Sequence, residues 1–120
     1  MKVAVTSQTK SIDSIIDERF GRCNFFIIVE PDSMEYEVLP NEAIASSSGA
    51  GIKAAQELIN KKVDAVITGN IGPNAFDILK QAGIKIFRAF GNVKEAIEKF
   101  KEKKLEEIRM ANVGKHGGMI

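Results

Sequence analysis

The sequence contains two short segments whose residue types could bind an anion. The first, Gly69-Asn70-Ile71-Gly72-Pro73-Asn74, follows an apolar strand pattern at 63–68 and precedes a helical pattern. Unpaired backbone N–H groups and the positive dipole end of a helix start attract carboxylate, phosphate or an anionic metal cluster. Gly69 and Gly72 would let the main chain approach such a ligand, and Pro73 suits a first helical position. A Gly-rich turn between strand and helix is also a purely structural feature of many α/β sheets, so both interpretations stay open here.

The second segment, Asp17-Glu18-Arg19-Phe20-Gly21-Arg22-Cys23, lies in a long connection, 7–24, that shows no convincing helical period. Such connections inside a compact domain are usually functional or flexible. The two arginines could give forked hydrogen bonds to an anion, and Cys23 could bond a soft metal when ionised. The structural alternative is an ion pair between Asp17 and either arginine, with the phenylalanine as an anchor and Cys23 as a small buried residue.

Hydrophobic periodicity places these segments in a chain of strands and helices. Pro31-Asp32-Ser33 is a turn so short that the strand patterns on either side must form an antiparallel hairpin. Gly83 is suited to end the second helix, and Asn92 with Glu95 resembles a capping box before the third. Strand patterns occupy 2–6, 25–30, 35–39, 65–68 and 84–87, and helical patterns occupy 52–59, 76–82 and 93–100.

The order of these elements predicts a three-layer α/β/α fold. We expect a five-stranded mixed sheet in the order 3-2-1-4-5, with only strand 2 antiparallel to the others. This topology brings the end of strand 1, the 19–23 loop, the 46–49 loop and the 69–74 turn to one edge, where open α/β sheets bind ligands. The candidate binding residues at this edge are Ser7, Arg19, Phe20, Gly21, Arg22, Cys23, Gly69, Asn70, Gly72 and Asn74.

Composition indicates one ordinary globular domain. The chain has 120 residues, 44% of them hydrophobic, and a net charge of +1. These values predict a single domain, placed at 1–108. The hydrophobic pattern fades beyond Leu105, so we expect a flexible tail at 109–120. The low net charge and the lack of a long apolar run argue against nucleic acid and membranes as partners. We expect a cytoplasmic protein, because a single cysteine, Cys23, agrees with a reducing compartment. We also expect a monomer or weak homodimer.

Residues that ligate metals are scarce in this sequence. It holds one cysteine, one histidine and scattered carboxylates, so a cluster held by four cysteines of one chain is excluded. Cys23 could still supply one bond to a preassembled cluster, or two chains could each offer Cys23. His116, in a glycine-containing segment, could supply a second ligand. The alternative for His116 is a solvated side chain in a loose tail.

Enzyme interpretations find weaker support. Gly49-Ala50-Gly51-Ile52-Lys53-Ala54 formally fits a dinucleotide-binding pattern, but Pro40 and a polar loop separate it from the preceding strand. These glycines are better explained as the start of a helix packed closely on the sheet. Two-metal hydrolysis needs carboxylates on the central strands, and the first strand pattern, 2–6, has none. We therefore expect a protein that is not an enzyme.

The chain resembles the nitrogenase cofactor-biosynthesis family, also called the dinitrogenase iron-molybdenum cofactor family. The resemblance spans most of the sequence, and several motifs in the family's order are more specific than any single one. These motifs are Ile16-Asp17-Glu18-Arg19-Phe20-Gly21-Arg22, Gly49-Ala50-Gly51-Ile52-Lys53-Ala54-Ala55, Thr68-Gly69-Asn70-Ile71-Gly72-Pro73-Asn74-Ala75 and Gly83-Ile84.

The resemblance implies a ribonuclease-H-like fold. For nitrogenase-linked members it also implies binding or carrying of an iron-sulfur or iron-molybdenum-type cluster as cargo, and therefore a cluster donor or acceptor protein as partner. It does not imply a reaction catalysed by this domain. Nitrogenase-linked members typically carry histidines beside the Phe-Gly pair, where this chain has Arg19 and Arg22. Arginine can neutralise a cluster but does not ligate iron as imidazole does.

These observations predict a non-catalytic protein that binds or carries an anionic metallocofactor at the edge formed by Ser7, 19–23 and 69–74. A different class of function is also compatible with the same loops. In that alternative the protein is an adaptor whose edge loops dock a partner protein, without a ligand of its own.

Overall fold

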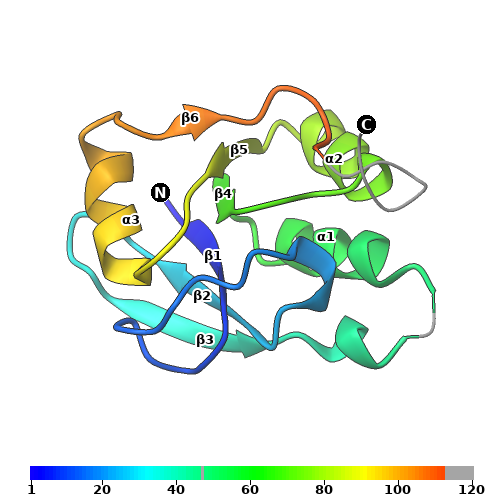
Figure 1. The fold of residues 1–120 in the computed structure, drawn as a ribbon, viewed down its shortest axis with the longest axis horizontal. Coiled ribbons are helices and arrows are strands. Elements are labelled where there is room, and N and C mark those ends of the chain that lie inside the picture. The colour runs from blue at the N-terminus through cyan, green and yellow to red at the C-terminus, as the bar shows by residue number, and fades with distance from the viewer. Residues whose placement is uncertain (47, 113–120) are drawn as a thin grey trace.

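A mixed β-sheet forms the centre of the computed structural model, which describes residues 1–46 and 48–112 (Figure 1). Within these residues the sheet has six strands in the order β3-β2-β1-β4-β5-β6. The strands are β1 (Val3–Ser7), β2 (Phe25–Val29), β3 (Tyr36–Pro40), β4 (Ala65–Thr68), β5 (Lys85–Arg88) and β6 (Glu106–Glu107).

The predicted order and direction of the first five strands are confirmed. β2 runs antiparallel to both β1 and β3, whereas β4 is parallel to β1 and β5 is parallel to β4. The sixth strand was not predicted from the sequence. β6 contributes only Glu106 and Glu107, which pair antiparallel with Arg88 and Phe87 of β5. Two adjacent acidic residues carry no strand pattern, so backbone pairing at the open edge of the sheet is what orders them.

Helices cover both faces of the sheet, as a three-layer fold requires. α1 (Ala50–Asn60) and α2 (Pro73–Gln81) lie on one face, and α3 (Val93–Lys101) lies on the other (Figure 1). Neighbouring strand residues point to opposite faces, so Val66 packs in the core beneath α1 and α2 while Ile67 packs beneath α3. In the described part of the chain, no helix has the length and apolar character needed to cross a membrane.

The helix boundaries follow the signals in the sequence. Pro73 is the first residue of α2, and Gly83 follows that helix with φ +79°. Asn92 caps α3, because its side-chain oxygen accepts a hydrogen bond of 3.0 Å from the backbone N–H of Glu95. The predictions for Pro73 and Gly83 are confirmed, and so is the Asn92 half of the predicted capping box, since these features depend on local backbone geometry.

Two lysines occupy helix ends where glycine is the usual residue. Gly83 ends α2 in the left-handed region, and Lys62 after α1 and Lys103 after α3 take the equivalent place, both with φ +60°. In each case the backbone N–H bonds back to the carbonyl three residues earlier. A side chain with a Cβ costs about 1 kcal/mol in this conformation, so each lysine is held there against a local preference.

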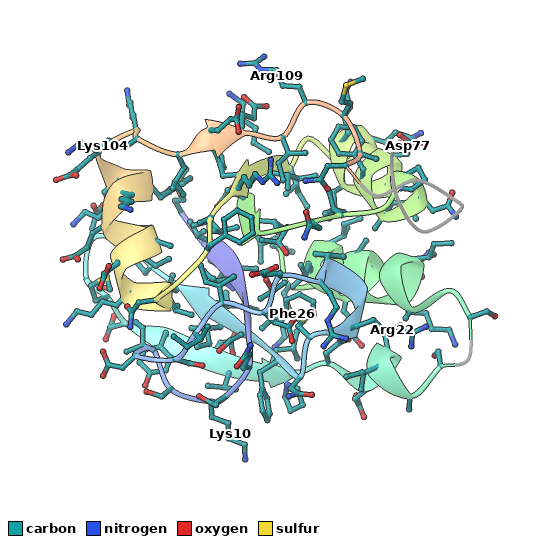
Figure 2. The ribbon with its side chains drawn as sticks, in the orientation of Figure 1. Lys10, Arg22, Phe26, Asp77, Lys104 and Arg109 are labelled. Carbon is teal, nitrogen blue, oxygen red and sulfur yellow. The ribbon has the colours of Figure 1, made fainter. Side chains whose placement is uncertain are left out.

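Phe20 and Phe26 tie the long first connection to the sheet. Both side chains are almost fully buried, and their ring centroids lie 5.6 Å apart. Figure 2 shows Phe26 in the interior, whereas the labelled Lys10, Lys104 and Arg109 lie at the periphery. Phe20 starts a short 3-10 turn, η1 (Phe20–Arg22), so its burial fixes the position of the neighbouring polar residues.

Candidate functional site

A groove of about 470 Å³ opens at the edge of the sheet where β1 and β4 end. It lies between η1 and the first turns of α1 and α2, so three segments that are distant in the sequence meet there. The prediction that these segments lie at one edge is confirmed by this geometry. The lining residues are 19–22, 49–52, 70 and 72–75.

Backbone hydrogen bonds join the two segments that the sequence singled out. Arg19 and Asn70 form an isolated parallel bridge. The N–H of Phe20 donates to the carbonyl of Asn70 at 3.1 Å, and the N–H of Asn70 donates to the carbonyl of Glu18 at 2.7 Å. The arginine turn and the Gly-rich turn are therefore held together as one unit.

The η1 turn also packs directly on the start of α1. A Cβ placed on Gly21 would lie 2.8 Å from the backbone nitrogen of Gly51, a distance that real side chains do not adopt. Glycine is thus required by close backbone approach. The contact brings the backbone nitrogen of Gly51, in the first turn of α1, against η1 at the groove.

Asn41 holds the η1 turn in place by hydrogen bonds, and the sequence analysis did not identify it. Its side chain is buried, and its Nδ2 donates to the carbonyls of Gly21 at 3.2 Å and Cys23 at 2.9 Å. An asparagine after Pro40 has the appearance of an ordinary loop residue, so no pattern in the sequence distinguishes it.

The two arginines lie at the groove with different partners. The Arg19 guanidinium lies 3.4 Å from the buried Asp17 carboxylate. Of the two ion pairs considered from the sequence, Asp17 with Arg19 or with Arg22, the structure therefore contains the one with Arg19. Arg22 instead donates through Nη1 to the carbonyls of Ser46 at 3.1 Å and Ile44 at 3.4 Å. Carbonyl bonds leave the positive charge of Arg22 uncompensated, and the side chain is exposed.

Both helices that start at the groove lack the groups that normally neutralise a helix N-terminus. Gly49 and Gly72 stand at the capping positions of α1 and α2, and neither first turn contains an acidic residue or receives a side-chain hydrogen bond. α3, which starts outside the groove, has both the Asn92 cap and Glu95. No carboxylate is among the described residues that line the groove. Its electrostatic character therefore favours an anion.

Asn112 fastens the Gly-rich turn from the far end of the described chain. Its Oδ1 accepts a hydrogen bond of 2.7 Å from the N–H of Ile71, and its Nδ2 donates to the carbonyl of Gly69 at 3.2 Å. Asn112 belongs to the segment predicted as a tail, whose residues 113–120 lie outside the described residues. His116, a predicted metal ligand, is among them.

Ser7 and Cys23 belong to the same edge but do not line the groove. Both are fully buried; the Ser7 hydroxyl donates to the carbonyl of Thr9 at 2.7 Å, and the Cys23 thiol donates to the carbonyl of Phe20 at 3.4 Å. Burial, followed by the nearby negative charge of Asp17, raises the pKa of Cys23 to about 12. Metal ligation by Cys23 would require η1 to open. Among residues 1–46 and 48–112, no group of three or more His, Cys, Asp or Glu side chains is placed to hold a metal ion.

Cys23 is therefore expected to resist alkylation in the folded protein. Raising the pKa of the thiol from 9.0 to about 12 lowers the thiolate fraction at pH 8 by about a thousandfold. Iodoacetamide labelling at pH 8, followed by mass spectrometry with and without denaturant, measures the difference. The native state also keeps this proton where the unfolded state loses it, so the free energy of unfolding should fall as pH rises from 9.0 towards 12. Equal labelling rates in the two states would contradict the buried thiol.

Known proteins are similar to this chain in sequence and in fold. An uncharacterized protein of Methanocaldococcus jannaschii is 38% identical over 97 residues, which cover 78% of this chain and 82% of that protein. The apo form of the orange protein from Desulfovibrio gigas has a TM-score of 0.89 and 33% identity, covering 92% of this chain and 95% of the other. A putative NifB protein from Thermotoga has a TM-score of 0.77 and 43% identity, covering 88% and 91%.

One family model matches nearly the whole chain. The model of the dinitrogenase iron-molybdenum cofactor family matches residues 1–103, which include both groove segments and all three helices. The chain therefore belongs to the dinitrogenase iron-molybdenum cofactor family.

Proposed function

We propose that this protein is a non-catalytic carrier that holds an anionic metallocofactor, an iron-sulfur-type cluster or its precursor, in the groove between η1, α1 and α2. One observation carries the proposal. Two helix N-termini without caps and two arginines meet at a single groove whose described lining contains no carboxylate. The helix starts and the uncompensated Arg22 favour negative charge, and Arg19, although it is paired with Asp17, still presents exposed N–H donors.

The comparisons support the same class of ligand. The family is described by the iron-molybdenum cofactor of dinitrogenase, and the relative from Thermotoga is described as a putative NifB protein. The fold of the Desulfovibrio gigas orange protein is described in its apo form. These descriptions belong to those proteins, and they favour a metallocluster over a simple phosphate as the anion proposed here.

The lining residues fit carriage better than catalysis. Backbone N–H groups and guanidinium groups bind an anion without forming a covalent bond to its metal, so the cluster can leave intact. The described lining offers no carboxylate, imidazole or thiol to move protons or attack a substrate. A carrier of this kind needs a cluster donor and a cluster acceptor, which we propose as its partner proteins.

A binding titration with a synthetic thiolate-ligated iron-sulfur cluster, a small dianion, tests the proposal under anaerobic conditions. The Arg19→Ala/Arg22→Ala variant should bind at least about tenfold more weakly and with a flatter dependence on salt, because two charge-assisted contacts are lost. Arg88→Ala/Arg109→Ala is the matched control, since it removes the same charge outside the groove lining. Cys23→Ser should bind like the wild type.

The results separate the possible sites. Equal weakening by both double-arginine variants would show only a general effect of net charge and would contradict the groove as the site. A loss of thiolate-to-iron absorption in Cys23→Ser alone would instead assign the bond to the metal to Cys23.

The adaptor alternative is supported by exposed apolar side chains at the same edge. Phe90 is 49% exposed, and its ring lies where a Cβ on Gly69 would meet it at 2.9 Å. Ile44, whose carbonyl binds Arg22, is 38% exposed. A carrier purified without oxygen should show the colour of its cluster, whereas an adaptor should be colourless. The exposed side chains also suit a carrier that docks its partners around the groove.

A further inference from the structure

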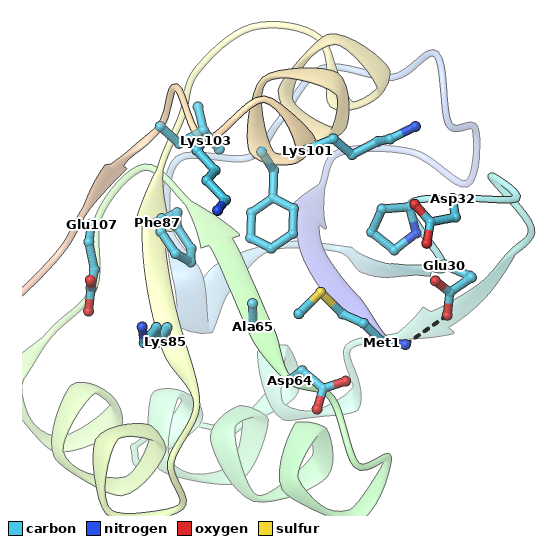
Figure 3. Close-up of a pocket in the computed structure, with 13 residues that line it drawn as sticks. Met1, Glu30, Asp32, Asp64, Ala65, Lys85, Phe87, Lys101, Lys103 and Glu107 are labelled. Carbon is cyan, nitrogen blue, oxygen red and sulfur yellow. Dashed lines mark hydrogen bonds and ion pairs between the residues drawn. The ribbon is translucent and has the colours of Figure 1, made fainter.

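A second cavity, larger than the groove, lies at the opposite edge of the sheet (Figure 3). Its volume is about 670 Å³, within the usual range for pockets that bind small molecules. The starts of β4 and β5, the turn after β2 and the end of α3 surround it. Because it shares no lining residue with the groove, it can be occupied independently.

Aromatic and aliphatic side chains form the floor of this cavity. The rings of Phe87 and Phe100 lie 5.2 Å apart at an angle of 80°, and both side chains are only partly buried. Leu105 and the buried Ala65 complete the apolar surface. A flat apolar group could cover the ring surfaces that these phenylalanines leave open.

Three of the four carboxylates around the cavity already have partners. Glu30 binds the N-terminal ammonium group of Met1 at 3.0 Å. Asp64 accepts a hydrogen bond of 2.8 Å from the main chain. Glu107 lies 3.4 Å from the guanidinium of Arg109. The two ion pairs offset the negative charges of Glu30 and Glu107, whereas the main-chain hydrogen bond leaves the charge of Asp64 in place.

The lysines of the cavity, in contrast, have no such partners. Lys85, Lys101 and Lys103 line the cavity, and none of them forms an ion pair with any residue of 1–46 or 48–112. Figure 3 shows the Lys103 ammonium directed into the cavity towards Phe87. Asp32, on the turn after β2, is the one lining carboxylate without a bonded partner in the described chain. Among the described residues, three lysines without ion pairs therefore face two carboxylates without ion pairs, Asp32 and Asp64, which leaves a surplus of one positive charge.

Lys103 is also one of the two lysines that replace glycine at a helix end. Lys62 has the same φ of +60° at the end of α1 but does not line the cavity. The pair therefore provides a natural control, because replacement of either lysine by glycine relieves the same backbone cost and removes the same charge.

We propose that this cavity binds a small organic anion with a flat apolar body, such as an aromatic carboxylate or sulfonate. The body packs on Phe87 and Phe100, and the acidic group pairs with the Lys103 ammonium. The site shares no residue with the metallocofactor groove, so either proposal can be correct without the other.

Fluorescence titration with 8-anilinonaphthalene-1-sulfonate, an aromatic sulfonate, tests this site. We expect saturable binding to the folded protein, and Lys103→Gly should weaken it by at least about fivefold through loss of a charge-assisted contact. Lys62→Gly should bind like the wild type. Both variants should melt at or above the wild-type temperature, which shows that any loss of binding does not come from unfolding.

Several results would overturn the proposal. Equal affinity of Lys103→Gly and Lys62→Gly would remove Lys103 from the site, and equal binding of the uncharged analogue N-phenyl-1-naphthylamine would exclude recognition of the anion. Loss of binding in Arg19→Ala/Arg22→Ala, with Lys103→Gly unaffected, would place the probe in the groove instead. Failure of cluster binding in the groove leaves the expected fluorescence result unchanged, so the two outcomes are distinguishable.

Discussion

Gly21→Ala is expected to lower the free energy of unfolding by about 2 kcal/mol and to weaken anion binding in the groove. The new Cβ would lie 2.8 Å from the nitrogen and 2.9 Å from the Cα of Gly51. Both atoms belong to the backbone of α1, which cannot rotate away as a flexible side chain would. The η1 turn must therefore move off the helix, and Arg22 moves with it. Urea denaturation followed by circular dichroism measures the loss.

Gly72→Ala is the control for this variant within the same groove. Nothing lies within 4 Å of a Cβ placed on Gly72, and its backbone is extended, with φ −80° and ψ 170°. Its unfolding free energy should stay within about 0.5 kcal/mol of the wild type, because an added methyl group meets neither a clash nor a strained conformation. If the two variants were equally stable, the close packing of η1 on α1 would be wrong.

Asn41→Ala should cost about 2 kcal/mol and increase the mobility of the arginine turn. The side chain is buried, and its Nδ2 donates hydrogen bonds to the carbonyls of Gly21 and Cys23, at 3.2 Å and 2.9 Å. Removing it leaves those carbonyls without their donor, and the cost of an unpaired buried polar group exceeds the net value of the bond. Hydrogen exchange at 19–23 should become faster, together with a lower urea midpoint.

Asn24→Ala provides the comparison for Asn41→Ala. Asn24 also donates from its side chain to a backbone carbonyl, that of Gln8 at 3.2 Å, but it is exposed to solvent. Water can replace that bond, so the change should cost less than about 1 kcal/mol. A cost for Asn24→Ala as large as that for Asn41→Ala would show that burial does not account for the difference.

The parts of the fold that could be predicted are those that depend on local patterns. The short turn 31–33 required a hairpin, and the later alternation of strands and helices required parallel crossovers, which together determine the order of five strands. The same reasoning located the arginine turn and the Gly-rich turn at one edge. Topology was sufficient because both turns directly adjoin strands whose directions were known.

The parts that could not be predicted depend on contacts between distant residues. Asn41 matters because its amide faces two carbonyls of another loop, and Cys23 is shielded because η1 folds over it. Neither relation leaves a periodic pattern or a spacing in the sequence. β6 formed because the edge of β5 was available, although Glu106 and Glu107 have little strand propensity.

The uncapped N-termini of α1 and α2 have a consequence for the abundance of this protein in the cell. A ligand that binds only the folded state raises its stability by about 2.7 kcal/mol when its free concentration is a hundred times its Kd. If the groove holds the anion proposed here, the loaded protein unfolds less often than the empty one. Proteases that degrade unfolded chains would then remove empty molecules first, and the amount of protein would follow the supply of its cargo.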